Sequence, residues 1–185
     1  RDEGSHSDFL NAVGGLLGDS RLVFRYLLYN DGQGAGKRLF IGGGVVLPSK
    51  NTITSDPFFL KGEEKTNHRH FSMSEGAYKI VVESQYYKKR LTNPVFIGGS
   101  ITIEAPLSTN GYGYKASNLY DLSLTALTKE IPKLSMSLSF GFTTRHSTEA
   151  YWNDIPTPNS RSTILTPSLG FIWNVEVKEY TVYNH

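Results

Sequence analysis

The sequence predicts an all-β protein: an up-and-down antiparallel transmembrane β-barrel with short periplasmic turns and long extracellular loops, or an incomplete portion of one. Two observations predict it. About seven segments alternate apolar and polar residues with the period of a β-strand, and the connections between them are alternately short and long. An up-and-down strand order places every second connection at the same end of the sheet, and outer-membrane barrels carry tight turns at one end and long loops at the other.

The segments form a single β-barrel domain over residues 1–185. They run over about residues 21–29, 38–47, 77–87, 95–105, 119–128, 134–145 and 163–178. The connections over 30–37, 88–94 and 129–133 are short, whereas those over 48–76, 106–118 and 146–162 are longer and rich in polar residues, Gly and Pro. Most segments reach the roughly 9–11 residues that a tilted strand needs to cross the hydrocarbon layer.

The number of strands stays open. Bacterial single-chain barrels have even strand counts, whereas about seven segments are visible in this sequence. Since no signal peptide precedes Arg1, we expect the chain to be either a mature protein or part of a longer one. We therefore expect strands to be missing at one or both ends of a barrel of about ten to fourteen strands. Alternatively, residues 179–185 begin an eighth strand and close a small barrel.

Composition narrows the class of protein. Charged residues make up 19% of the chain and hydrophobic residues 38%, and the formal net charge of +2 is too small to indicate a nucleic-acid partner. The longest mainly apolar run, Leu39 to Leu47, is far shorter than the roughly 20 residues of a membrane-spanning helix. The absence of cysteine excludes a disulfide framework, a thiol nucleophile and cysteine-ligated zinc.

The segment 134–145 shows the alternation most clearly. Its large apolar residues fall on one face and are predicted to face lipid: Leu134, Met136, Leu138, Phe140 and Phe142. The other face carries Ser, Gly and Thr residues and ends in Arg145. In a soluble sandwich the same apolar face would pack in a core, so this alternation does not by itself separate the two classes.

Charged strand residues nearly all avoid the predicted lipid face, where a charge costs about 2–4 kcal/mol near mid-bilayer. The residues predicted to line the lumen are Arg25, Lys79, Glu83, Glu104, Asp121 and Arg145. Opposite charges in a narrow lumen are expected to pair, because an unpaired buried charge is costly. A paired network would fill a small barrel, whereas in a wider barrel the same residues would line a permeation path and bias its ion selectivity.

Aromatic residues near the short turns are expected at the membrane interface, where an amphipathic ring lies at the level of the lipid headgroups. These residues are Tyr26, Tyr29, Tyr86, Tyr87 and Phe96. The alternative is that aromatic residues simply favour strands.

One sequence pattern occurs twice. The run Phe40-Ile41-Gly42-Gly43-Gly44, which leads to Pro48, is echoed by Phe96-Ile97-Gly98-Gly99-Ser100, which leads to Pro106. Both copies follow a short turn and end at a proline that opens a longer loop. Proline is tolerated there because the hydrogen-bonded ladder ends. A repeated hairpin unit is what growth of a barrel by duplication would leave.

Short motifs near the N-terminus resemble a known family. They are Gly18-Asp19-Ser20-Arg21-Leu22, then Arg25-Tyr26-Leu27-Leu28, then the Gly-rich segment ending in Leu47-Pro48-Ser49. They resemble the outer-membrane barrel family labelled MetA-pathway of phenol degradation, whose members show Gly-Asp-x-Arg-Leu and a Gly-rich strand ending in Leu-Pro-Thr-Gly. The resemblance covers roughly residues 14–50, is echoed weakly at 163–170, and departs at Ser49-Lys50. It implies an outer-membrane location and passage of small, often aromatic, compounds, and it transfers no catalytic residue.

Three other segments suggest chemistry and have simpler explanations. Residues 32–38 are glycine-rich like a phosphate loop, but Arg38 stands where that motif needs Ser or Thr, so a hairpin turn is preferred. Residues 67–72 bring Asn, His and Ser together as in a hydrolase, and His68, His70, Glu63, Glu64 and His146 could bind a metal ion between loops. An exposed loop is the preferred interpretation of both. Residues 88–90 are basic and are expected in a solvated turn or at lipid headgroups.

The sequence thus favours a protein of the bacterial outer membrane that admits small molecules by passive diffusion, hydrophobic or aromatic compounds among them. We expect outer-membrane lipids around it, a partner protein or oligomer as an option, no nucleic acid, no metal, no cofactor and no enzymatic activity. Two alternatives stay open: a structural or docking barrel that binds a partner protein, and a soluble β-barrel that binds an apolar ligand.

Overall fold

The computed structural model describes residues 17–58, 72–177 and 180–184, and these form two antiparallel β-sheets and no helix. The predicted all-β class is therefore confirmed. No described residue belongs to a helix long and apolar enough to span a membrane.

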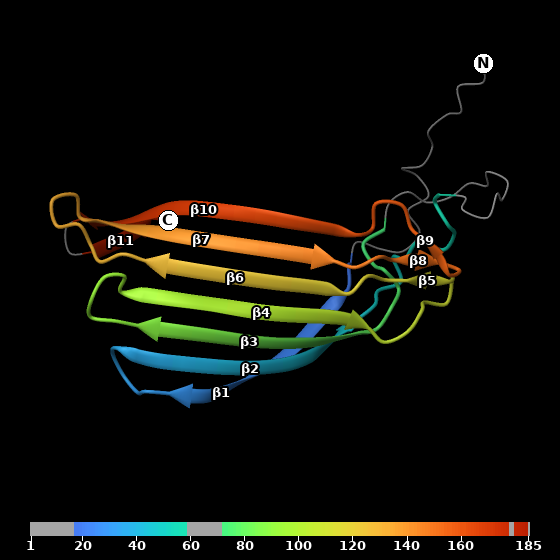
Figure 1. Cartoon of the computed structure of the whole chain (residues 1–185), viewed down its shortest axis with the longest axis horizontal. Coiled ribbons are helices and arrows are strands. Elements are labelled where there is room, and N and C mark those ends of the chain that lie inside the picture. Colours follow the sequence, from blue (N-terminus) through green and yellow to red (C-terminus); the bar gives the residue numbers. More distant parts are fainter. Residues whose placement is uncertain (1–16, 59–71, 178–179, 185) are drawn as a thin grey trace, which may run out of the picture.

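The main sheet has eight strands, in the order β1-β2-β3-β4-β6-β7-β10-β11. Its strands are β1 (Ser20–Asn30), β2 (Gly36–Leu47), β3 (Lys79–Lys89), β4 (Phe96–Pro106), β6 (Leu119–Leu127), β7 (Met136–Ser147), β10 (Ser162–Val177) and β11 (Tyr180–Asn184). The order in space follows the order in the chain, so the sheet is an up-and-down meander. The strands lie side by side along the long axis, with the short turns at one end and the long loops at the other (Figure 1).

Each of the seven predicted segments corresponds to one strand of this sheet, and the boundaries agree to within two residues. The eighth strand, β11, pairs with the end of β10 from Trp173 to Val177. It confirms the additional strand that the alternative expected in residues 179–185, but not the closed small barrel that the same alternative expected. Strands β1 and β11 are the two edges, so the described residues form an open sheet and not a closed barrel.

The start of β7 corrects one predicted position. Leu134 was expected in the strand, but it lies in the turn before it. Pro132 favours this turn, in which the backbone N–H of Leu134 donates to the carbonyl oxygen of Ile131 at 3.0 Å. Ser135 follows with a φ of 46°, in the left-handed region, so the extended backbone begins only at Met136.

The long-loop end contains a second sheet that the alternation pattern did not predict. It has three short strands, β5 (Tyr114–Lys115), β8 (Tyr151–Trp152) and β9 (Ile155–Pro156), in that order. Asn153 and Asp154 join β8 to β9 with φ values of 48° and 67°, which is the conformation of a two-residue hairpin turn. Trp152 is buried there, so the described parts of the long loops are folded.

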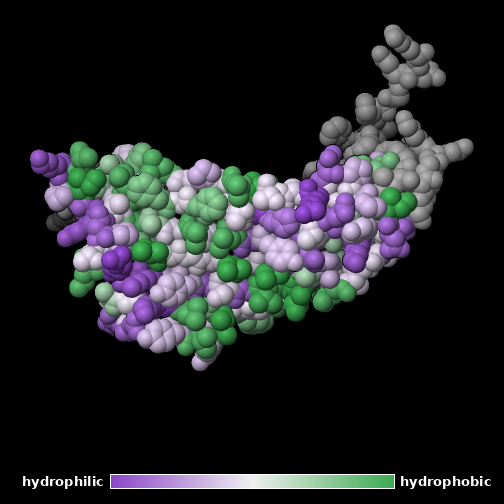
Figure 2. Space-filling view, in the orientation of Figure 1, coloured by the Kyte–Doolittle hydropathy of each residue, from purple (hydrophilic) through white to green (hydrophobic). Residues whose placement is uncertain are grey.

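The main sheet exposes many large apolar side chains. Among the main-sheet residues whose exposure the structure describes, only Val46 and Val81 are buried apolar side chains. Large apolar side chains on the other face are exposed, such as Phe24 at 73% and Leu169 at 71%. Figure 2 shows hydrophobic residues gathered in patches on the surface, with hydrophilic residues between them.

Candidate functional site

All six predicted lumen-lining residues lie on one face of the main sheet, which we call the inner face. Directly opposed residues of neighbouring strands lie on the same side of a sheet, so the strand register assigns each residue to a face. By this register the inner face carries Arg25, Lys79, Glu83, Glu104, Asp121 and Arg145. The opposite face, which we call the outer face, carries Phe24, Ile41, Val82, Ile101, Leu124, Phe142 and Leu169.

Four of these charges stand at one level of the inner face. The register places six residues directly opposite one another across neighbouring strands, and we call them the charge row: Arg25, Gly42, Glu83, Thr102, Asp121 and Arg145. The row crosses the sheet from β1 to β7. Its two basic residues stand at its ends and its two acidic residues between them.

Arg25 reaches Glu83 by crossing over Gly42. The guanidinium forms two contacts with the carboxylate, from Nε to Oε1 and from Nη2 to Oε2, the second at 3.2 Å. A Cβ atom on Gly42 would lie 2.6 Å from Cγ of Glu83, closer than Cβ atoms approach other heavy atoms. The glycine therefore leaves the space in which the carboxylate of β3 and the guanidinium of β1 meet.

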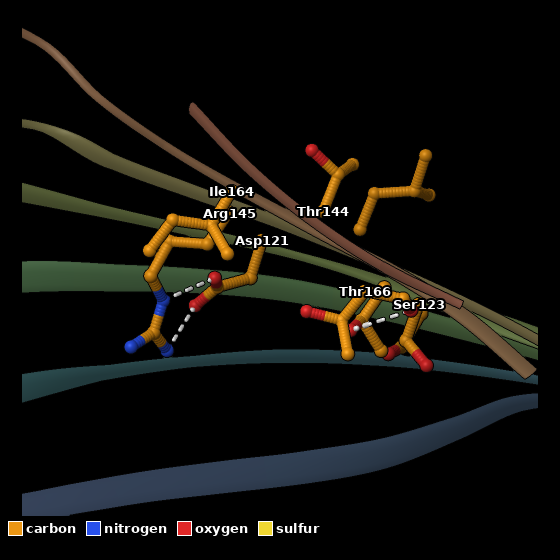
Figure 3. A pocket seen from close by; sticks show the side chains of 9 residues that line it. Asp121, Ser123, Thr144, Arg145, Ile164 and Thr166 are labelled. Carbon is orange, nitrogen blue, oxygen red and sulfur yellow. Dashed lines mark hydrogen bonds and ion pairs between the residues drawn. The ribbon is translucent and has the colours of Figure 1, made fainter. Parts of the chain in front are cut away.

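Asp121 and Arg145 form the second pair of the charge row. Nε of Arg145 lies 2.7 Å from Oδ1 of Asp121, and Nη2 lies 3.0 Å from Oδ2, so the contact is bidentate (Figure 3). This geometry fixes the orientation of the two side chains relative to each other. Neighbouring strands β6 and β7 supply the two residues.

A third group of charges lies nearer the long loops. Nζ of Lys79, which is buried, lies 2.8 Å from Oε1 of Glu104 and also contacts Glu75. Arg21 approaches the other oxygen of Glu104 at 3.6 Å. Every predicted lumen-lining charge therefore has a partner of opposite sign, as expected. The partners within the sheet lie on nearby strands and not across an enclosed space.

A groove of about 470 Å³ lies beside the Asp121–Arg145 pair. Its inner-face lining is Ser100, Asp121, Ser123, Thr143, Arg145, Ile164 and Thr166. The register aligns four of these, Ser100, Ser123, Thr143 and Thr166, directly across β4, β6, β7 and β10, and we call them the hydroxyl row. In Figure 3, Ser123 and Thr166 lie on the same side of the strands as the ion pair, and Thr144 lies on the other side.

The aromatic residues at the short-turn end divide between the faces. Tyr26, Tyr29 and Tyr86 lie exposed on the outer face, but Tyr87 and Phe96 lie on the inner face, so the five residues do not form one band on the predicted lipid face. There Tyr87 contacts Phe40 edge-on at 6.2 Å between ring centroids and stacks on Phe96 at 5.6 Å. We call these three residues the aromatic cluster.

The repeated sequence pattern explains this arrangement. Phe40 and Phe96 start the two copies, which form β2 and β4, and β3 lies between them. The glycine two residues after each phenylalanine faces a large side chain of β3: Gly42 faces Glu83, and Gly98 faces Tyr87. A Cβ on Gly98 would lie 2.5 Å from Cδ1 of Tyr87. Each copy thus supplies a glycine over which a β3 side chain lies.

The predicted lipid-facing residues of β7 lie on the outer face. Met136, Leu138, Phe140 and Phe142 alternate there along the strand, and Phe140 is 48% exposed. On neighbouring β10, Phe171 and Trp173 stack on the same face with ring centroids 4.7 Å apart. The outer face is therefore apolar on several neighbouring strands.

Tyr114 anchors the small sheet at the long-loop end. Its ring lies 5.2 Å from that of Trp152, measured between centroids. Burial, and to a smaller extent the nearby charge of Glu75, raises the pKa of Tyr114 to about 12. The side-chain amide of Asn110 donates to the carbonyl oxygen of Glu75 at 2.9 Å and so ties this region to the start of β3.

The glycine-rich segment 32–38 is a hairpin turn followed by β2, as the preferred interpretation predicted. Gly32 and Gly34 have φ values of 96° and 91°, and Arg38 donates to the carbonyl oxygen of Gly32 at 2.8 Å. Hydrogen bonds from the Tyr29 hydroxyl and from the backbone N–H of Lys37 hold the pKa of Asp31 below its usual range. The carboxylate of Asp31 therefore stabilises the turn by accepting these hydrogen bonds.

The described residues include only part of the other candidate sites. Residues 67–71, with both predicted histidines, and Glu63 and Glu64 lie outside them. His146 lies on the outer face, with its Nδ1 2.8 Å from the hydroxyl of Thr163. No group of three or more His, Asp or Glu side chains within the described ranges is arranged to hold a metal ion. The basic residues 88–90 lie at the short-turn end, where β3 ends.

Comparison with known proteins gives no assignment, because no family model matches the chain and no curated protein matches it.

Proposed function

We propose that this chain is an outer-membrane β-barrel that admits small molecules by passive diffusion along its inner face. One observation carries the proposal: the main sheet exposes its apolar side chains and pairs its charges on the opposite face. A soluble protein buries such an apolar face, since exposed patches larger than a few hundred Å² are rare on monomers. A membrane barrel turns the apolar face to lipid and the polar face to its lumen.

Strand length supports a membrane-crossing role. Strands β1, β3 and β4 have 11 residues each, and β2 and β7 have 12. These lengths fit the roughly 9–11 residues of a tilted strand that crosses the hydrocarbon layer. The short turns would then face the periplasm, and the long loops the exterior.

In a membrane, the two free edges of the main sheet would have to be paired. Unpaired backbone groups in hydrocarbon cost several kcal/mol each, so spanning sheets close on themselves. An edge strand leaves one row of such groups unpaired, and β1 and β11 are the edges of the main sheet. The two edges run in opposite directions, because they are the first and last strands of an antiparallel meander of even number. They are therefore compatible with antiparallel closure.

The width of the lumen decides whether solutes pass. A closed barrel of eight strands has an interior that side chains fill. The ion pairs of the inner face are made between nearby strands, so they are complete without an opposite wall. Such pairing fits a barrel of either size, so passage of solutes requires a lumen wider than eight strands enclose, built with further strands or a second copy of the chain. The motifs that resemble the MetA-pathway of phenol degradation family agree with an outer-membrane location, and membership in that family stays a prediction.

The proposal is tested in membranes. We expect the full chain to require detergent for extraction, to migrate differently in gels before and after heating, and to make liposomes swell in solutions of small solutes. Solubility without detergent would establish the soluble alternative. A protein that inserts stably but gives neither swelling nor conductance would contradict passage of solutes and leave the barrel.

A second candidate function is docking of a partner protein at the long-loop end. The three-stranded sheet of β5, β8 and β9 favours it, because an ordered surface suits binding better than mobile loops do. Stable co-purification of one partner with a non-conducting barrel, lost when Asn153 and Asp154 are deleted, would support docking.

A further inference from the structure

The groove beside Asp121 and Arg145 has the properties of a site for an uncharged polar solute. We propose that it is a subsite for neutral solutes that carry several hydroxyl groups and have the size of a small sugar. This inference rests on the proposed function, because it names the class of solute that the inner face selects.

The Asp121–Arg145 pair supplies donors and acceptors without net charge. Arginine has about five N–H donors, and a carboxylate accepts about four hydrogen bonds. The pair itself uses two of each, at 2.7 and 3.0 Å, so both residues keep capacity for a ligand. A hydroxyl group donates and accepts at once, and therefore suits a place where both kinds of partner stand side by side.

Charge balance disfavours ions at this level of the inner face. Asp121 neutralises Arg145, and Arg25 neutralises Glu83 in the same row. An anion would have to compete with Asp121 for the guanidinium, and a cation with Arg145 for the carboxylate. A neutral solute meets no such competition and keeps both ion pairs intact.

The hydroxyl row extends the polar contacts along the groove. Neighbouring strands lie about 4.8 Å apart, so Ser100, Ser123, Thr143 and Thr166 present hydroxyl groups at that spacing. The Thr143 hydroxyl has a weak contact at 3.5 Å with the carbonyl oxygen of Thr166, which a better partner can replace. A solute with hydroxyls on several carbons spans from one of these side chains to the next.

The volume of the groove and an apolar side chain in its lining also suit a small sugar. The groove volume of about 470 Å³ lies within the roughly 300–1,000 Å³ of small-molecule sites. Ile164, 55% exposed, gives the C–H surface of a sugar an apolar contact. No aromatic residue lines the groove, and the rings of the aromatic cluster contact one another outside it, so the groove itself offers no aromatic surface to an aromatic solute.

The test uses the full chain in planar bilayers, with maltose as the probe. We expect maltose to reduce the current through the wild-type protein in a saturable manner. Thr143→Val keeps the side-chain shape and removes the hydroxyl, so it should weaken this block about two- to tenfold, the range of one neutral hydrogen bond. Thr125→Val is the matched control, because Thr125 on β6 also lies on the inner face but outside the groove.

The outcomes separate the inference from the function on which it rests. Equal weakening by both valine variants, absence of block by maltose, or equal block by glucuronate would overturn the subsite while leaving passive diffusion. If the wild-type protein inserts but does not conduct, the proposed function fails. Equilibrium binding of radiolabelled maltose to the detergent-solubilised chain then decides the inference, and absence of saturable binding overturns it. A heat-dependent gel shift of each variant confirms that it folds.

Discussion

Arg25 on β1 binds Glu83 on β3 across the intervening strand, through the space that Gly42 of β2 leaves open. The ion pair therefore joins three strands, although only two of them supply charges. Glu83 is buried and would be costly to leave without a partner, so the space above Gly42 matters to the pair as well as its two charges.

Substitution of Gly42 tests this relationship. Gly42→Ala places a Cβ atom 2.6 Å from Cγ of Glu83, so the carboxylate must move away from Arg25. We expect destabilisation of about 1–3 kcal/mol, as for other overpacked sites, measured by urea unfolding in phospholipid vesicles. Gly43→Ala is the control, because a Cβ there would meet its nearest neighbour at 3.7 Å. Equal stability of the two variants would show that Gly42 has no such role.

Ion selectivity should follow the charge row. Since each guanidinium there is neutralised by a carboxylate, we expect the wild-type protein to separate cations from anions weakly. Asp121→Asn leaves Arg145 uncompensated and should shift the reversal potential in a KCl gradient towards anion selectivity. Arg145→Gln should shift it towards cation selectivity.

The double variant Asp121→Asn with Arg145→Gln restores charge balance and serves as the control. Its reversal potential should return towards the wild-type value. Conductance with an unchanged reversal potential in both single variants would show that the charge row does not border the path.

Much of the main sheet could be predicted from the sequence because its strands are long and alternate on two faces. That alternation placed Arg25, Glu83, Asp121 and Arg145 on one face, and the strand register agrees. It did not give the vertical alignment of these residues, which depends on how far each strand is shifted against its neighbour. The charge row therefore appears only when the pairing is known.

Other features were missed because their signals are short. The β8–β9 hairpin has two residues in each strand, too few for a period to show, although Asn153-Asp154 is a suitable two-residue turn. The aromatic cluster was missed because Tyr86 and Tyr87 are adjacent and point to opposite faces, while both were assigned to the interface. The repeated pattern does indicate this cluster, since it places a phenylalanine and a glycine on each side of β3.

The ionisation of Tyr114 should report on the small sheet at the long-loop end. Its pKa of about 12 lies above the ordinary value of 10.0, because burial disfavours the tyrosinate. The stability linked to this group is fully present below pH 10. It is lost as the pH rises from 10 through about 12, where the unfolded chain releases the proton and the folded chain still holds it.

Ultraviolet difference absorbance should therefore show that Tyr114→Phe removes the amplitude of one tyrosine from the late part of the tyrosinate titration. Trp152 fluorescence should change over the same range in the wild-type protein, since the two rings lie 5.2 Å apart. A late amplitude that is unchanged in Tyr114→Phe would contradict the assignment to Tyr114.

A charge should lower the free energy of unfolding far more on the outer face of β6 than on its inner face. Leu124 lies on the outer face near the middle of the strand, and the next residue, Thr125, lies on the inner face. If the outer face contacts lipid, Leu124→Lys should lower the free energy of unfolding in phospholipid vesicles by about 2–4 kcal/mol, because the ammonium group enters hydrocarbon. Thr125→Lys places the same charge in the polar interior and should cost much less. If the outer face is instead exposed to water, Leu124→Lys should be nearly neutral, so equal effects at these neighbouring positions would contradict contact of the outer face with lipid.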